Sequence, residues 1–237
     1  MKLEKVTNES CEGGRRWYND ACGTALGMEL VGERWSLLIV RELLLGPRRF
    51  GELRAGLPGL SANVLTQRLA GLEEAGILER HRIPPPANVQ VYALTPWGLE
   101  CEPVVFGLAR WALRSPAHDP LLNFSAVSLV LLFKMLLVRE RAAGFTATVA
   151  IRLDGEDYGV ALADGAIRVW RGKPEDADAT IEGSPGKFLP VMFGGRPLAD
   201  AEAMGDLRAS GDRALAERFL GLFALPPKIA IAPSMPD

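Results

Sequence analysis

Three polar residues in the first half of the chain have types and a spacing that suit the reading of DNA bases. Asn63 and Gln67 are four residues apart and Thr66 lies beside Gln67, so all three side chains would lie on or beside one helix face. An Asn or Gln amide can form two hydrogen bonds with adenine, and a Thr can bond a phosphate or touch a thymine methyl group. The pattern predicts a helix that reads base edges in the major groove.

Residues near this helix could supply the positive charge and hydrogen bonds that phosphates need. Ser61 is the expected N-cap, and the free N–H groups of a helix N-terminus favour anions. The formal net charge is −2, but phosphates respond to the local charge and not to the total. The other candidate DNA contacts are Arg48, Arg49, Arg68, Arg80, His81, Arg82 and Asn88. The alternative is that these charges are only solvated and that the helix mediates protein contacts.

Helices and strands that could position these residues follow from the hydrophobic pattern. Two helices are expected within 21–45, then helices over 49–57 and 61–75, and strands over 77–83 and 89–95 joined by the Pro-rich loop 84–88. A fifth helix is expected over 96–114, kinked at Pro103. Its expected inward stripe is Trp97, Cys101, Val104, Leu108 and Trp111. This order of elements predicts a winged helix-turn-helix.

Residues 22–114 resemble the HxlR-type winged-helix regulators. The resemblance rests on GERW, LLLGPRRFGEL, PGLS, LTQRLAGLEEAGI and YALTPWG, and on a Cys before the first helix. It implies a homodimer on a pseudo-palindromic operator in double-stranded DNA. Each subunit would place helix 61–75 in the major groove and loop 84–88 near the minor groove. Repression is the commoner behaviour of such regulators.

The residue pattern in the second half of the chain predicts a strand meander and then helices. Apolar residues alternate over 145–153, and Asp-Gly turns bound the next strand, which indicates an antiparallel meander. A further short strand is expected over 178–183, then a helix through Phe193, and a last helix over 212–223. Residues 121–138 are apolar nearly all round, and a helix buried in protein is favoured over a membrane span because Lys134 interrupts them.

The stretch from about Phe124 to Leu225 resembles the sterol-carrier-protein type 2-like fold. The most distinctive segments are ADATIEGSPGKFLPVMFGGRP and LRASGDRALAERFLGLF. The resemblance implies an apolar tunnel for lipid-like molecules between the sheet and its helices. Large apolar residues could line it, although ordinary core packing is the alternative for each of them: Trp170, Phe188, Met192, Phe193, Phe219 and Phe223. A fold retained only for dimerisation is a further alternative.

The whole chain is therefore expected to be an α+β protein of two domains. Residues 1–116 would form the winged-helix domain, and 117–237 an α/β sandwich with an antiparallel-rich sheet. No apolar leader opens the sequence, so a cytoplasmic protein is expected.

The three cysteines and two histidines give no disulfide framework, metal pattern or catalytic motif, so neither an enzyme nor a cofactor is expected. Cys22 is a candidate redox switch at a helix start, and its alternative role is a small buried apolar residue. Cys101 is expected in the core and Cys11 in a disordered tail.

Three functional hypotheses follow. The first is a transcriptional regulator whose operator affinity responds to an apolar small molecule in the C-terminal domain. The second is a thiol-based redox regulator that uses Cys22. The third is a carrier of hydrophobic ligands whose winged helix binds other proteins.

Overall fold

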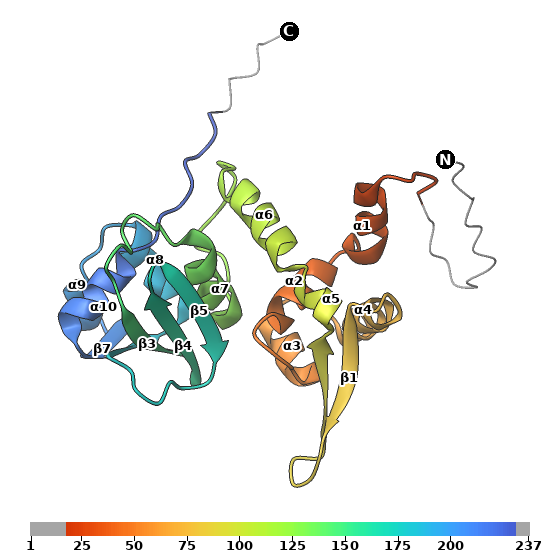
Figure 1. Cartoon of the computed structure of the whole chain (residues 1–237), viewed down its shortest axis with the longest axis horizontal. Coiled ribbons are helices and arrows are strands. Elements are labelled where there is room, and N and C mark those ends of the chain that lie inside the picture. Colours follow the sequence, from red (N-terminus) through yellow and green to blue (C-terminus); the bar gives the residue numbers. More distant parts are fainter. Residues whose placement is uncertain (1–17, 231–237) are drawn as a thin grey trace.

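The computed structural model describes residues 18–230, so Cys11 lies outside the described part. Figure 1 shows two lobes, one built from the first half of the chain and one from the second. Each lobe has its own cluster of buried apolar side chains. The α+β class is confirmed, with a winged helix-turn-helix first and an antiparallel-rich sheet second.

The N-terminal lobe begins with four helices and a two-stranded wing. The elements are α1 (Gly23–Val31), α2 (Ser36–Leu43), α3 (Phe50–Gly56), α4 (Ala62–Glu74), β1 (Leu78–Ile83) and β2 (Val89–Leu94). Gly32 ends α1, and Gly76 follows α4 with a φ of 72°, a left-handed conformation that glycine adopts at low cost. The antiparallel β1–β2 pair runs from Leu78 opposite Leu94 to Ile83 opposite Val89. Figure 1 shows this hairpin projecting from the lobe.

The helix expected over 96–114 is two helices, α5 (Pro96–Leu99) and α6 (Glu102–Leu113). Thr95 caps α5, since its Oγ1 accepts a hydrogen bond from the Gly98 N–H at 3.0 Å. Pro103 lies in the first turn of α6, where its missing N–H costs no helical hydrogen bond. The prediction of a kink there was wrong, because the proline starts a new helix.

The apolar stripe expected to face inward on this helix is largely exposed. Trp97, Val104 and Leu108 are about half exposed, and Trp111 reaches 73%. Phe106 is the residue of α6 that is buried, and it packs into the core of the C-terminal lobe. Val105 lies at the edge of both cores. Because α6 contributes to both lobes, the division between residues 116 and 117 stays a prediction.

The C-terminal lobe is a five-stranded sheet with helices packed on it. Its elements are α7 (Ala126–Leu136), β3 (Ala147–Leu153), β4 (Glu156–Ala163), β5 (Ala166–Arg171), β6 (Ala179–Gly183), α8 (Pro185–Phe193), α9 (Leu198–Ala203), β7 (Leu207–Gly211) and α10 (Arg213–Leu220). The strand order is β5-β4-β3-β6-β7. Strands β3, β4 and β5 form the expected meander, but β6 pairs with β3 in parallel. Helix α9 was not predicted, and the last helix ends at Leu220 and not at residue 223.

Helix α7 is buried along nearly its whole length, from Val127 to Leu136. Its apolar residues pack in the core of the C-terminal lobe, and Lys134 pairs with Glu102 of α6. The expectation of a helix buried in protein is confirmed. Within residues 18–230, no helix is both long enough and apolar enough to cross a membrane.

Candidate nucleic-acid interface

Helix α4 presents the expected polar face. Leu65, Leu69 and Leu72 are buried and fix the helix against the lobe. The Ser61 Oγ accepts a hydrogen bond from the Val64 N–H at 3.3 Å, so Ser61 is the N-cap.

The side chains of Asn63, Thr66 and Gln67 are exposed on the opposite side of α4. The Thr66 hydroxyl donates to the Ala62 carbonyl at 2.9 Å, which leaves its methyl group and an oxygen lone pair for a partner. Within the described part of the chain, neither the Asn63 nor the Gln67 amide has a side-chain hydrogen bond. Both amides are therefore free to bond base edges, as an adenine-reading residue must be.

Arg68 is held by the protein itself. Its Nε donates to the Arg34 carbonyl at 3.0 Å, and its Nη2 lies 2.8 Å from the Glu33 carboxylate. These bonds tie α4 to the turn between α1 and α2. A phosphate contact by Arg68, as expected from the sequence, would have to displace them.

The basic residues of the wing are exposed but also have partners. Arg80 forms an ion pair with Glu73, whose pKa is lowered by the hydrogen bond from Arg80. The His81 Nε2 lies 2.9 Å from the Glu79 carboxylate. The Arg82 Nε donates to the Asn88 Oδ1 at 2.9 Å, which braces the wing loop. DNA phosphates would compete with these exposed pairs, which are weak in water.

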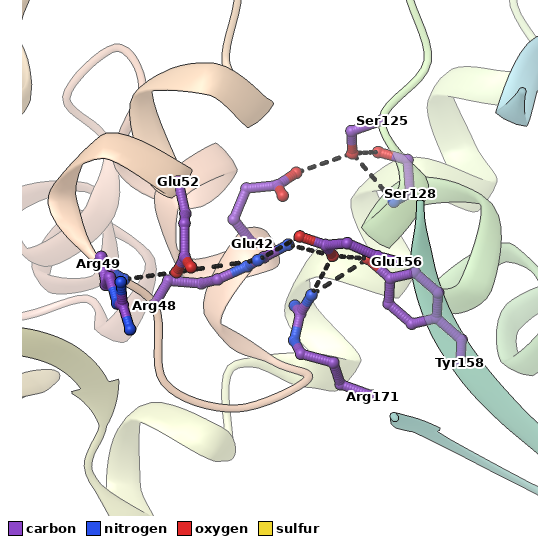
Figure 2. A network of polar contacts seen from close by, with 9 residues as sticks. All are labelled: Glu42, Arg48, Arg49, Glu52, Ser125, Ser128, Glu156, Tyr158 and Arg171. Atoms are coloured by element: carbon purple, nitrogen blue, oxygen red, sulfur yellow. Dashed lines mark hydrogen bonds and ion pairs between the residues drawn. The ribbon is translucent and has the colours of Figure 1, made fainter. Parts of the chain in front are cut away.

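Arg48 does not lie on the expected DNA-binding surface. Its side chain is 11% exposed and points to the C-terminal lobe, where its Nη1 and Nη2 donate to the Glu156 carboxylate at 2.8 and 2.9 Å (Figure 2). The Arg48 backbone bonds Tyr92 of β2 in both directions, which fixes the position of the loop before α3. The expectation of a DNA contact at Arg48 is corrected, whereas Arg49 is exposed.

Glu156 is the centre of a polar network between the lobes. It also accepts hydrogen bonds from the Tyr158 hydroxyl at 2.6 Å and from the Arg171 Nη1 at 2.7 Å (Figure 2). The hydrogen bonds from Arg48 lower the pKa of Glu156 to about 2. Burial, together with the bond to Glu156, raises the pKa of Tyr158 to about 12. Glu156 is therefore charged, and Tyr158 neutral, across the physiological pH range.

A second polar contact joins α2 to the start of α7. Glu42 is buried on α2, and its Oε1 accepts from the Ser125 hydroxyl at 2.8 Å and from the Arg41 Nη2 at 2.7 Å. Figure 2 shows Glu42 and Ser125 reaching toward each other from the two lobes. A cavity of about 580 Å³ lies beside both contacts, and Arg48, Glu42, Ser125 and Glu156 are among its lining residues. Sequence reasoning missed Glu42, although an acid between Val40 and Leu43 of the buried helix face was a usable signal.

The six candidate ligand-binding residues do not form an apolar tunnel together. Phe188, Phe219 and Phe223 are almost completely buried. The rings of Phe219 and Phe223 pack against Phe133 with centroids 5.2 and 5.0 Å away, which fills the space between them. They form part of the core, which is the alternative role that the sequence left open for them. Met192 is also buried, and Phe193 packs partly buried against the same core.

Trp170 lies elsewhere, on β5. Its ring stacks under the Arg168 guanidinium at 4.5 Å and lines a shallow hollow of about 430 Å³ with Lys173 and Thr148. The surroundings of Trp170 are polar, and they differ from those of the five other candidates.

Cys22 is exposed at the N-cap of α1, so the alternative of a small buried apolar residue was wrong. Hydrogen bonds from Thr24, first of all from its backbone N–H, lower the pKa of the Cys22 thiol. Cys101 is partly buried, and burial raises its pKa. No group of His, Cys, Asp and Glu able to hold a metal occurs within residues 18–230.

Comparison with known proteins finds a matching family for each half of the chain. Residues 30–119 match the HxlR-like helix-turn-helix family, and residues 132–224 match the SCP-2 sterol transfer family. An HTH-type transcriptional regulator of Bacillus subtilis, YvaP, is 40% identical over 86 residues, which are 36% of this chain and 79% of YvaP. The chain belongs to the HxlR-like helix-turn-helix family of DNA-binding transcriptional regulators. It joins an HxlR-type winged helix to a sterol-carrier-like domain.

Two solved structures are also similar to parts of the chain. The reduced form of the transcriptional regulator YodB from B. subtilis is 32% identical, with a TM-score of 0.38, over 41% of this chain and 98% of YodB. The sec-alkylsulfatase Pisa1 from Pseudomonas sp. is 21% identical, with a TM-score of 0.39, over 44% of this chain. The match spans only 17% of the sulfatase.

Proposed function

We propose that this protein is a dimeric, sequence-specific repressor whose operator affinity is modulated by an apolar small molecule. The observation that carries the proposal is the exposed face of α4, where Asn63, Thr66 and Gln67 stand on a helix fixed by three buried leucines. Such a helix fits the major groove, and its amides offer the bonds that adenine needs. The β1–β2 loop would lie near the minor groove, and Arg49 and Arg82 would contact phosphates.

Exposed apolar side chains support the dimer. Val104, Leu108 and Trp111 follow one face of α6, and Leu26 and Met28 are exposed on α1. An exposed apolar stripe such as that on α6 is costly in water and typical of a subunit interface. A two-fold dimer through α6 would present two copies of α4 to two half-sites, which is why a pseudo-palindromic operator is expected. Repression requires only that the dimer occupy the operator.

The proposal is tested by selecting duplexes from a random DNA library with the full-length protein. We expect an inverted repeat whose half-sites are about one helical turn apart. For the selected duplex, the logarithm of the binding constant should fall linearly with the logarithm of salt concentration, because phosphate contacts release counterions. If no duplex is enriched, or if binding ignores salt, the proposal is wrong and the role of a hydrophobic-ligand carrier is favoured.

A thiol switch is the second candidate, because Cys22 is exposed and its pKa is lowered. Cys22 precedes the helix that carries Leu26 and Met28, so a modification there would act on the proposed dimer surface. If neither oxidants nor Cys22→Ser changes the operator affinity, this candidate is excluded.

A further inference from the structure

An apolar cavity of about 230 Å³ lies where α2, α6 and α7 meet, at the junction of the two lobes. Its walls include Val105, Ala109 and Leu113 of α6, and Leu131 and Met135 of α7. None of the ligand-binding residues expected from the sequence lines it.

Polar contacts at both ends of α6 hold the helix at a fixed position against α7. Near the start of α6, the Lys134 Nζ donates to the Glu102 carboxylate at 2.6 and 2.7 Å. Farther along, the Arg110 Nη2 donates to the Met135 carbonyl at 2.6 Å. Ala109, between these ties, and Ala112, just beyond Arg110, present small side chains to the cavity. The polar contacts therefore fix α6 against α7, and the small side chains between the two helices leave a space.

The polar groups in the cavity wall include donors that could bond an anionic head group. Arg41, His118 and Ser128 are present in the wall, whereas no carboxylate lines it. Arg41 is 23% exposed and its Nε and Nη2 bind Glu42, so the Nη1 remains for another partner within the described structure. A monocarboxylate could bond this guanidinium while its apolar part fills the space between α6 and α7.

The volume limits the size of the ligand. It exceeds the roughly 150 Å³ cavity that holds a benzene ring and is below the roughly 300 Å³ at which pockets for drug-sized ligands begin. A single aromatic ring with a short chain, or a medium-chain fatty acid, meets both limits.

We propose that this cavity is the effector site, and that it binds a small apolar monocarboxylate, with its carboxylate at Arg41. The inference rests on the proposed function, because it locates the effector of that repressor. The cavity touches α2 of the helix-turn-helix, α6 with its exposed stripe, and α7 of the C-terminal lobe. A ligand there would shift α6 relative to α2 and change the distance between the two copies of α4 in the dimer.

The test uses decanoate as the probe, with 1-decanol as its uncharged analogue, in calorimetric titrations of the full-length protein. We expect one decanoate per chain and at least tenfold weaker binding of 1-decanol. Ala109→Phe fills the cavity and should weaken decanoate binding at least tenfold. Ala112→Phe is the second variant in case the first does not fold. Ala143→Phe makes the same change at an exposed residue outside the cavity and should alter binding less than twofold.

Arg41→Gln should remove the preference for decanoate over 1-decanol. The inference is overturned if decanoate does not bind the wild type, or if it binds the folded Ala109→Phe and Ala112→Phe proteins as tightly as the wild type. Salt-dependent binding to the selected duplex is measured on the same samples. DNA binding without decanoate binding overturns only this inference, whereas decanoate binding without DNA binding overturns the proposed repressor.

Discussion

The guanidinium of Arg48 meets the carboxylate of Glu156 through two hydrogen bonds of 2.8 and 2.9 Å, although the residues are 108 positions apart in the chain. Arg48 belongs to the loop before α3 in the helix-turn-helix, and Glu156 is the first residue of β4 in the other lobe. A bidentate pair of this kind fixes orientation as well as distance. The pair therefore attaches the C-terminal lobe to the loop that precedes α3 of the helix-turn-helix.

Replacing Glu156 by Gln should destabilise the protein at neutral pH. The folded-state pKa of Glu156 is about 2, against an ordinary value of 4.5, so the charged carboxylate stabilises the fold. Since the Glu156 side chain is 43% exposed, solvent screening reduces the effect, and we expect a loss of about 1 kcal/mol in the free energy of unfolding. Urea unfolding of both proteins measures it.

The pH dependence of this difference has a definite sign. A lowered folded-state pKa gives stability that is fully present above pH 4.5 and is lost as the pH falls toward 2. The gap between wild type and Glu156→Gln should therefore narrow over that interval. Asp154→Asn, the same change of charge two residues earlier, is the control and should leave stability within about 0.5 kcal/mol. A gap that widens on acidification would contradict the role of the pair.

Arg48 and Arg49 should behave differently although they are neighbours. Arg49→Ala should reduce the slope of log K against log salt by about 0.9, the contribution of one phosphate contact. Arg48→Met should leave the slope unchanged and lower the melting temperature, because the Arg48 guanidinium pairs with Glu156 at the junction of the lobes. Equal slope changes in both variants would show that Arg48 leaves the lobe junction when DNA binds.

Trp111→Glu should convert the dimer to a monomer. Trp111 is 73% exposed on α6, and a carboxylate placed in an apolar interface would lose its hydration without gaining a partner. Sedimentation equilibrium or native mass spectrometry reports the mass directly. Met204→Glu adds the same charge at an exposed residue of the C-terminal lobe and should leave the dimer intact. A dimer that survives Trp111→Glu places the interface elsewhere.

Cys22 should react with iodoacetamide faster than Cys101. The Cys22 thiol is exposed with a lowered pKa, whereas burial raises the pKa of Cys101, and the thiolate is the reacting form. Peptide mapping after timed quenching distinguishes the two sites in one sample. Faster labelling of Cys101 would mean that α6 opens in solution and that Cys22 is less reactive than its position indicates.

Much of the N-terminal lobe was predictable from the sequence because helix periodicity separates buried from exposed positions. Leu65, Leu69 and Leu72 are buried and Asn63 and Gln67 exposed, as the 3.6-residue period requires. The N-cap role of Ser61 followed from residue type in the same way.

Other features depend on tertiary contacts that local patterns do not encode. Val104, Leu108 and Trp111 form the apolar face of an amphipathic helix. The spacing of apolar residues does not tell whether the same chain or a second copy of it covers that face. A phenylalanine such as Phe219 can either fill a core or line a ligand tunnel. Only its packing against Phe133 shows that it fills the core. The pairing of Arg48 with Glu156 could not be found from spacing, because the fold alone brings the two residues together.

The measurement that tests the account most directly is the ratio of affinities for the selected operator and a scrambled duplex, compared between wild type and the Asn63→Ala, Gln67→Ala double variant. Fluorescence anisotropy gives both affinities, and circular dichroism checks the fold. Each amide–base pair contributes about 1–3 kcal/mol of discrimination, so the ratio should fall at least tenfold while salt-dependent binding to both duplexes remains. An unchanged ratio in a folded double variant would contradict the assignment of α4 as the helix that reads the operator.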